Sequence, residues 1–406
     1  MKILGIETSC DETAVCLINA EGKIGDIKAC PNEQLFRRVK ILGNQIYSQI
    51  ALHEQYGGVF PMMAKREHAK NLVPLFEKCL EESNLLKRKM DPRIHEDDKS
   101  KIKEILVRES GMYEQLIQLV EKIEKPDIDA IAVTNGPGLE PALWVGVNFA
   151  KALSEYWSIP LIPTNHMEGH ILAASLDQIK NSEPHSNQFL IKEIKFPAIA
   201  LLISGGHTQL VLAEDWLQYE IIGNTKDDAV GEAYDKVARI LGLTYPGGPK
   251  ISKLAEKERL ENPSKKTSYP LPRPMIHSKD LDFSFSGLKT AVLYTVKKIP
   301  ELTDAIKQEI AKEFEDAVLE VLLTKTKSAI EKYNTKTIII GGGVSANKKI
   351  REKFAELAKK LEIDFLVPEV SASTDNAVMI AVAGFINIIS GKKFETEFKA
   401  QGNLTL

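Results

Sequence analysis

The sequence predicts an α/β protein of two lobes, each built on its own sheet, with a cleft between the lobes. The first observation is a short apolar strand, a polar turn and a returning strand at residues 3–6 and 14–18. The second is the same pattern at residues 198–203 and 208–212, again with small and hydroxyl-bearing residues in the turn. Such strand–turn–strand patterns are hairpin signals. Their repetition indicates a duplicated lobe.

The other predicted elements alternate between strands and helices. Residues 130–134 form an apolar run that stops at a Gly-Pro turn, and a helical stretch follows over 144–157. Apolar residues at helical spacing across 306–321 predict an amphipathic helix. The strand expected at 337–340 runs into three glycines, and the chain is helical from Asn347 onwards. This order is typical of an α/β fold.

We place the first lobe at residues 1–165 and the second at 166–406, and we expect the last helix to pack back on the first lobe. The stretch at about 86–125 is highly charged and has helical periodicity. It therefore predicts a helical excursion on the surface, since a solvated helix is the usual form of such a run.

Composition and charge exclude several classes of protein. The chain has 53 Lys and Arg against 56 Asp and Glu, a formal net charge of −3, so no global basic field indicates a nucleic-acid partner. Its cysteines (Cys10, Cys16, Cys30 and Cys79) lack Cys-x-x-Cys spacing, which fits a reducing compartment. We see no signal peptide and no apolar run that would span a bilayer. We therefore expect a soluble, cytoplasmic protein.

Two histidines four residues apart, His166 and His170, are the strongest chemical signal. On a helix this spacing places both imidazoles on one face, close enough to hold one metal ion, with a third ligand from elsewhere. In a zinc protease motif, a Glu follows the first His directly. Here Met167 takes that place, and Glu168 points about 100° further around the helix. The pair therefore indicates a metal site and not a peptidase.

Two glycine-rich loops are candidates for holding an anion or a nucleotide. Ser204-Gly205-Gly206 joins two expected strands, and its backbone N–H groups could approach an anion closely; a plain hairpin turn is the alternative. Residues 341–343 follow a strand, and Asn347 could hydrogen-bond to a ribose or a base. The third glycine of a Rossmann fingerprint is missing, and the sequence has no P-loop.

Other polar segments admit both a structural and a functional interpretation. The turn at residues 7–13 could coordinate a phosphate-bound cation or be a polar hairpin, and residues 231–236 open a helix whose acidic residues would stabilise its dipole. Residues 373–376 could be a helix N-cap or supply the third metal ligand. Residues 246–300 hold eleven Lys and Arg against five Asp and Glu, a net charge of +6. That excess could face RNA phosphates or simply be solvated.

Read in order, these motifs resemble one family along nearly the whole chain. The matching stretches are residues 5–13, 56–59, 166–170, 204–208, 231–235, 245–249, 283–290, 342–347 and 373–376. They resemble the bacterial TsaD family of tRNA N6-adenosine threonylcarbamoyltransferases, within the actin-like, sugar-kinase and heat-shock ATPase superfamily. The resemblance implies a two-lobed actin-like fold of duplicated ribonuclease-H-like lobes, with charged helical insertions.

The resemblance also implies a metal, a substrate and a reaction. A divalent ion, iron or zinc, would bind His166, His170 and Asp375. Threonylcarbamoyl-adenylate would be the substrate, and ATP or ADP could occupy the same site. The threonylcarbamoyl group would pass to the N6 amine of adenosine 37 in tRNAs that read codons beginning with A, with release of AMP. The residues implied to contact this substrate are Leu202, Ile203, Ser204, Gly205, Gly206, Asp235, Gly248 and Asn347.

Asp11 and Glu12 are catalytic candidates by position only. The resemblance implies that the anticodon loop of tRNA is a partner, as are TsaB-like and TsaE-like proteins, with the adenylate supplied by a TsaC-like protein. We expect no membrane partner. A loop base is the kind of exposed single-stranded site that proteins read readily.

The chain departs from the family pattern at two residues and in two apparent insertions. Met62 stands where the family has Glu, Lys65 stands where it has Ser, and residues 86–125 and 177–195 look like insertions. A catalytically idle paralogue that acts as a scaffold is one alternative, although such scaffolds lack the His pair. An ATP-driven kinase or chaperone of the same fold is another.

Overall fold

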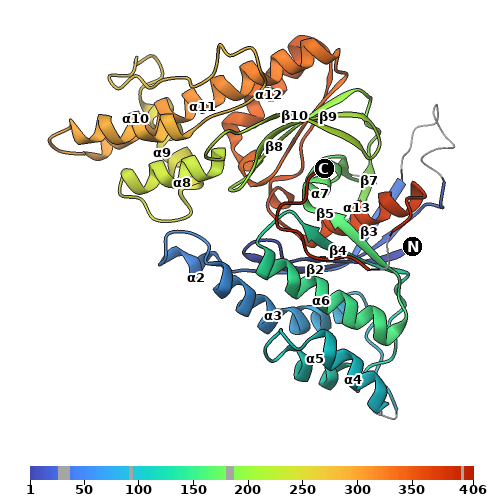
Figure 1. Ribbon diagram of the computed structural model, residues 1–406. Coiled ribbons are helices and arrows are strands. Elements are labelled where there is room, and N and C mark those ends of the chain that lie inside the picture. Colours follow the sequence, from blue (N-terminus) through green and yellow to red (C-terminus); the bar gives the residue numbers. More distant parts are fainter. Residues whose placement is uncertain (26–36, 91–94, 180–186, 395–396) are drawn as a thin grey trace. The chain divides into compact units, whose positions relative to one another are not determined.

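The computed structural model describes residues 1–25, 37–90, 95–179, 187–394 and 397–406 (Figure 1). They form two compact units. The first unit comprises Met1–Ala51, Val59–Glu193 and Asp375–Leu406, and the second comprises Leu52–Gly58 and Ile194–Thr374. Cys30 and part of the expected insertion at 177–195 lie outside the described residues.

The first unit is built on a sheet with the strand order β5-β4-β1-β2-β3-β7-β6. Strands β1 and β2 form the predicted antiparallel hairpin, and β4 and β5 extend the sheet in parallel with β1. The strands span Lys2–Glu7 (β1), Glu12–Ala20 (β2), Arg37–Ser48 (β3), Ala130–Gly136 (β4), Leu161–Asn165 (β5), Leu176–Gln178 (β6) and Gln188–Ile191 (β7).

Helices cover both faces of this sheet. The helices span Ile50–Glu54 (α2, at the border between the units), Pro61–Glu82 (α3), Glu96–Ile105 (α4), Met112–Val120 (α5), Glu140–Trp157 (α6), His166–Ala173 (α7) and Ala377–Ile389 (α13). Because side chains alternate along a strand, Leu4 and Ile6 of β1 enter the core that contains α3 and α6. Ile3 and Gly5 face α13 on the other side. A strand buried on both faces reads as a continuous apolar run, as β1 does.

The second unit repeats the hairpin on its own sheet, with the strand order β10-β9-β8-β11-β12. Strands β8 and β9 are antiparallel as predicted, and β11 lies parallel to β8. The elements span Ala198–Ile203 (β8), Thr208–Asp215 (β9), Gln218–Asn224 (β10), Val230–Ile240 (α8), Gly247–Glu261 (α9), Ser286–Lys297 (α10), Asp304–Tyr333 (α11), Thr337–Gly341 (β11), Lys348–Leu361 (α12) and Asp364–Leu366 (β12). The prediction of an α/β protein with two sheets is confirmed.

The two compact units divide the chain differently from the predicted lobe boundary at residues 165 and 166. Helix α7 follows β5 directly and packs on α13 within the first unit, and the chain enters the second unit only after Glu193. A short helix that returns to its own sheet looks in sequence like the start of a new lobe. The last long helix, α13, lies in the first unit and packs on β1, β2 and β4.

The charged excursion at 86–125 is helical in its described part, where it forms α4 and α5. It is not merely a solvated surface, because Ile102, Met112 and Leu116 are fully buried and join the core of the first unit. No helix among the described residues combines the length and apolar character needed to cross a membrane.

The contact between α13 and β4 gives the first prediction. A methyl group at Gly384 would lie 2.5 Å from the Cβ of Ala132. We expect Gly384→Ala to lower the free energy of unfolding of the first unit by about 1–3 kcal/mol through overpacking, despite the higher helix propensity of Ala. Gly287→Ala in α10 is the control, because a Cβ there meets nothing within 4 Å. It should stabilise its helix by about 0.4–1 kcal/mol. Chemical denaturation measures both, and a Gly384→Ala protein as stable as the wild type would contradict the close packing.

Candidate metal centre and substrate loops

Helix α7 presents both histidines because its start is fixed by a cap. The side chain of Asn165 accepts hydrogen bonds from the backbone N–H groups of Met167 (2.9 Å) and Glu168 (3.3 Å), so the helix begins at His166. The rings of His166 and His170 then lie on one face, with their centroids 4.7 Å apart. Both histidines are buried.

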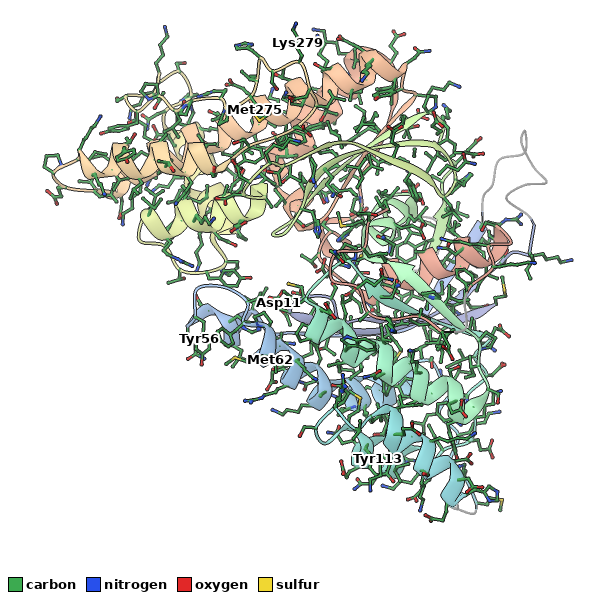
Figure 2. All side chains as sticks on the ribbon, in the orientation of Figure 1. Asp11, Tyr56, Met62, Tyr113, Met275 and Lys279 are labelled. Carbon is green, nitrogen blue, oxygen red and sulfur yellow. The ribbon has the colours of Figure 1, made fainter. Side chains whose placement is uncertain are left out.

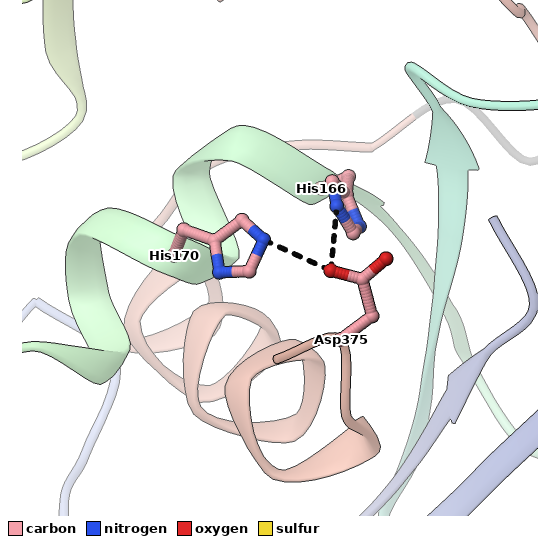
Figure 3. A group of neighbouring side chains, drawn as sticks. All are labelled: His166, His170 and Asp375. Atoms are coloured by element: carbon pink, nitrogen blue, oxygen red, sulfur yellow. Dashed lines mark hydrogen bonds and ion pairs between the residues drawn. The ribbon is translucent and has the colours of Figure 1, made fainter. Parts of the chain in front are cut away.

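Asp375 completes the cluster from the residue that precedes the α13 cap (Figure 3). Its Oδ1 lies 3.4 Å from Nε2 of His166 and 3.2 Å from Nε2 of His170. The three possible ligand atoms all lie within 4.8 Å of one another. The cap itself is Asn376, whose side chain accepts a hydrogen bond from Met379 N at 3.1 Å. Asn376 is therefore the N-cap, and Asp375 lies where a third metal ligand would be needed.

Glu7 is a residue of the centre that the sequence did not single out. Its Oε2 lies 3.0 Å from Nδ1 of His166 and accepts a hydrogen bond from Thr134 Oγ1 at 2.6 Å. Its Oε1 accepts one from Ser9 N at 2.5 Å. A carboxylate on Nδ1 orients the ring and favours a proton on that nitrogen, so that Nε2, which faces Asp375, is the nitrogen available to a metal ion. Strand alternation was the available signal, because Glu7 shares the face of Ile3 and Gly5.

Charge in this centre favours a cation. Burial raises the pKa of Asp375, but the imidazoles of His166 and His170 outweigh burial and lower it overall. Burial likewise opposes the shift at Glu7, whose pKa is lowered by His166. Burial lowers the pKa of His166, yet Asp375 and Glu7 raise it well above its usual value. The buried carboxylate of Glu7 and the half-buried carboxylate of Asp375 thus stabilise positive charge between them, whether a proton or a metal ion.

The donor set fits a divalent transition metal. Two imidazole nitrogens and one carboxylate oxygen converge, and a second carboxylate orients one imidazole from behind. Three protein ligands with open positions are the pattern of catalytic zinc sites, and imidazole with carboxylate also suits iron.

Asp11 and Glu12 lie at the β1–β2 turn, and both are buried. Ser48 Oγ donates a hydrogen bond to Glu12 Oε1 at 3.2 Å. Burial, followed by the charges of Asp11 and Asp375, raises the pKa of Glu12 to about 10. With no cation nearby, this shift favours the protonated form of Glu12. The Asp11 side chain is visible at this turn in Figure 2.

In the predicted substrate loop after β8, the backbone is more accessible to a ligand than the side chains are. Leu202 and Ile203 are fully buried, so their side chains belong to the core. Ser204 Oγ accepts hydrogen bonds from the N–H groups of Gly206 (3.3 Å) and His207 (3.1 Å). A Cβ added at Gly205 or Gly206 would meet nothing within 4 Å, so this backbone is open.

The second glycine run meets that loop at the carboxyl ends of β8 and β11. A Cβ at Gly342 would lie 2.5 Å from the carbonyl oxygen of Ile203, so only glycine fits there. The N–H of Gly231 donates to Ser204 O at 3.1 Å, which brings the start of α8 to the same edge. The carboxyl edge of parallel strands is where α/β folds commonly bind ligands.

Asp235 and Gly248 are brought together at the start of α9. Asp235 Oδ1 accepts a hydrogen bond from Gly247 N at 2.7 Å, and Gly248 donates to the same carboxylate. Burial raises the pKa of Asp235. This carboxylate borders a cavity of about 300 Å³ within the second unit, lined by Glu54, Gln55, Tyr56, Gly57, Asp235, Arg239, Leu243, Thr244 and Tyr245.

The side chain of Asn347 forms hydrogen bonds within the protein. Its Nδ2 donates to Ser252 Oγ (2.8 Å) and to Glu315 Oε1 (2.6 Å). Its Oδ1 accepts from Ile350 N at 3.0 Å and so caps α12. The predicted contact of Asn347 with a ribose or base stays a prediction, and in this arrangement its side chain has no donor left for it.

Three of the eleven basic residues at 246–300 form ion pairs with acidic residues of α11. Arg259 binds Glu315 (2.5 Å) and Asp316 (2.6 Å), and Lys265 binds Glu309 (2.6 Å). Arg273 likewise pairs with two glutamates of α11. A charge count along the sequence misses these partners, which lie beyond residue 300.

The two residues that depart from the family pattern, Met62 and Lys65, lie on α3. Met62 is 52% exposed near the start of the helix (Figure 2). Lys65 forms an ion pair with Glu109 at 3.4 Å, and Asn148 donates to the same carboxylate at 2.9 Å. Lys65 thereby links α3 to the segment between α4 and α5.

Fold and site define an α/β protein of two sheet-bearing units, with a three-residue candidate metal centre in one and glycine-rich loops in the other. A family model described as TsaD, tRNA N6-adenosine threonylcarbamoyltransferase, matches residues 40–92 and 108–382. The chain belongs to the TsaD family. Residues 93–107, within the predicted insertion, fall between the matched stretches.

Curated relatives match over almost the whole chain. A tRNA N6-adenosine threonylcarbamoyltransferase of Polynucleobacter necessarius is 40% identical over 401 residues, covering 96% of this chain and 93% of the relative. Another, of Thermosipho africanus, is 39% identical over 406 residues and all of both chains.

Solved structures with some similarity have low sequence identity. The activator of 2-hydroxyisocaproyl-CoA dehydratase from Clostridium difficile with bound ADPNP has a TM-score of 0.44 at 9% identity, over 96% of this chain and 95% of that one. A ROK family protein from Streptococcus pneumoniae in complex with sucrose also scores 0.44, at 12% identity over 97% and 99%.

The raised pKa of Glu12 gives a prediction about stability and pH. The shift from the ordinary 4.5 to about 10 means that the folded state holds a proton that the unfolded state releases. The contribution of Glu12 to stability is therefore fully present below pH 4.5 and is lost as the pH rises towards 10, by at most about 1.4 kcal/mol per pH unit.

Glu12→Gln removes this titrating carboxyl group. The decline in the free energy of unfolding with rising pH should therefore be shallower in the variant above neutral pH. Urea unfolding at pH 6 and pH 9, with a chelator present, compares the variant with the wild type. The chelator is needed because a nearby cation would favour the charged carboxylate. The same change in the free energy of unfolding between pH 6 and pH 9 in both proteins would contradict the raised pKa of Glu12.

Proposed function

We propose that this chain transfers the threonylcarbamoyl group of threonylcarbamoyl-adenylate to the N6 amine of adenosine 37 in tRNAs that read codons beginning with A, releasing AMP. Membership of the TsaD family supports the reaction, because relatives with that name match the chain from end to end. The structural observation that carries it is the convergence of His166, His170 and Asp375 on one point.

The same proposal includes one divalent metal ion, iron or zinc, held by His166, His170 and Asp375. When bound there, it would supply a Lewis acid for the carbonyl group under attack. Glu7 keeps the proton on Nδ1 of His166, and so presents Nε2 as a ligand. The burial of both histidines excludes bulk water from one side of the centre.

In the transfer, the N6 nitrogen forms a bond to the carbamoyl carbon while the bond from that carbon to the phosphate oxygen breaks. AMP leaves with the bonding pair, and the amine gives up one proton. Of the two acidic candidates, Asp11 is the proposed acceptor, because burial and neighbouring carboxylates raise the pKa of Glu12. Asp11 contacts the Glu12 side chain at the β1–β2 turn.

The glycine loops of the second unit are proposed to hold the adenylate. The backbone at Gly205 and Gly206 is open to a ligand, and the N–H group of Gly205 would suit a phosphate. The anticodon loop of tRNA and TsaB-like and TsaE-like proteins are the proposed partners. The intact His pair argues against an idle scaffold, and no observation favours a kinase.

Removal of the histidines tests the proposed function. His166→Ala with His170→Ala should lower the bound metal from about one ion per chain to a trace, and tRNA modification by about 100-fold or more. His277→Ala is the control, because His277 is an exposed histidine of the second unit. The measurements are metal analysis and a reconstitution with unmodified tRNA, threonine, bicarbonate, ATP and the partner proteins, each omitted in turn. Modification that survives in the double variant would sink the metal-dependent mechanism.

Glu7→Gln tests the carboxylate behind His166. The substitution keeps the shape of the side chain but removes the charge that fixes the imidazole, so zinc affinity should fall about 10- to 100-fold. Thr134→Val, which removes one hydrogen-bond donor to the same carboxylate, should have a smaller effect. Competition with a chromophoric chelator measures both affinities. An unchanged affinity in Glu7→Gln would show that His166 needs no partner on Nδ1.

A further inference from the structure

A buried polar pair with no part in the proposed reaction joins the two helices of the metal centre. Glu168 is 4% exposed on α7, and Asn387 is 1% exposed on α13. Asn387 is the single polar residue of α13, whose sequence is otherwise Ala, Val, Met, Ile, Gly and Phe. Burying a carboxyl and an amide costs free energy unless the two groups satisfy each other.

These two side chains do meet. Nδ2 of Asn387 donates one hydrogen bond to Glu168 Oε1 and a second to the carbonyl oxygen of Ala383, at 2.9 Å. The second bond ties the amide to its own helix, so the first bond transmits the position of α13 to α7. Oδ1 of Asn387 is buried and has no hydrogen-bond partner.

The backbones are also close beside this pair. A Cβ added at Gly169 would lie 3.1 Å from Cδ1 of Ile380 and 3.2 Å from Cγ of Met379. The absence of a side chain at Gly169 therefore lets the two helices approach this closely. Smooth apolar contact alone does not fix how far one helix slides along the other, and the directional hydrogen bond at Glu168 does.

The same two helices position all three candidate ligands. His166 and His170 lie two residues before and after Glu168 on α7, and Asp375 precedes the first residue of α13 by two positions. A slide of α7 along α13 would change both distances from Asp375 Oδ1 to the imidazole Nε2 atoms. Metal sites tolerate displacements of only about 0.5 Å.

We propose that Glu168 and Asn387 are positioning residues that set the register of α7 on α13, and with it the geometry of the metal centre. The inference rests on the proposed metal site and deepens it. Replacing a buried polar pair by apolar residues of similar volume is often neutral or stabilising. The pair is therefore explained by the geometry that it imposes and not by the stability that it adds.

The decisive variant is the double substitution Glu168→Leu with Asn387→Leu. It should fold with at least the stability of the wild type, because no polar group is left buried alone. It should nevertheless bind Co²⁺ and Zn²⁺ about 10- to 100-fold more weakly. Its Co²⁺ complex should show a shifted and weakened d–d absorption band. A double variant with wild-type affinity and an unchanged Co²⁺ spectrum would overturn the proposal.

Two further variants separate positioning from simple loss of stability. Glu168→Gln keeps an acceptor for Asn387 and adds a donor for the unpaired Oδ1, so its affinity and spectrum should stay within about 3-fold of wild type. Phe385→Leu removes a side chain of α13 that packs on Gly22, away from α7. It should lower stability and leave Co²⁺ binding unchanged.

Failure of this inference is distinguishable from failure of the proposed function. A wild-type protein that binds neither Co²⁺ nor Zn²⁺, like His166→Ala with His170→Ala, would remove the metal site itself. A wild type that binds both, alongside a double-leucine variant that binds equally well, would remove only the role of Glu168 and Asn387. A loss of Co²⁺ binding in Phe385→Leu equal to that of the double variant would also contradict positioning.

Discussion

The two ring nitrogens of His166 lie between two carboxylates, the buried Glu7 and the half-buried Asp375, and the rest of the centre depends on this arrangement. The two acids are more than 360 positions apart in the chain. They meet at one imidazole because α13 packs directly on β1 and carries Asp375 to the end of that strand. Gly5 and Gly384 make the packing possible, since a side chain at either position would strike the opposing element.

This arrangement is costly for stability and useful for binding a cation. Each buried carboxylate loses its hydration, and only hydrogen bonds and nearby positive charge offset that loss. Glu7 receives its hydrogen bonds from Thr134 and Ser9, so its place is fixed before any ligand arrives. A preorganised negative site of this kind gives up little further order when it binds a metal ion. In our proposal, Glu168 and Asn387 likewise fix the positions of the helices that carry the ligands.

Much of the fold could be predicted from local patterns. Apolar runs with polar turns gave the hairpins β1–β2 and β8–β9, and helical spacing gave α6 and α11. The His166–His170 spacing predicted its own geometry, because i and i+4 side chains meet wherever the segment is helical. These features depend on neighbours in sequence, so no tertiary information was needed.

What could not be predicted depends on which face of an element is covered, and by what. Glu7 looked like one acid among several in a polar turn, and only the packing of α7 and α13 shows that it faces His166. Arg259, Lys265 and Arg273 counted towards a basic excess because their partners, such as Glu315, lie on α11 beyond that segment. The expected lobe boundary fell at the end of β5, although α7 folds back on the sheet that it leaves.

The residues expected to hold the adenylate have side chains that are engaged within the protein. Leu202 and Ile203 are core side chains, and the polar atoms of Ser204 and Asn347 are engaged in turns and caps. The Asp235 carboxylate accepts a hydrogen bond from the backbone at the start of α9. The group left for a ligand is the open main chain of this loop, above all at Gly205, since the N–H of Gly206 donates to Ser204 Oγ. Main-chain donors read the charge and shape of a phosphate and not the identity of a base. In this protein the side chains of the second unit shape the loops, and the backbone of those loops would hold the nucleotide.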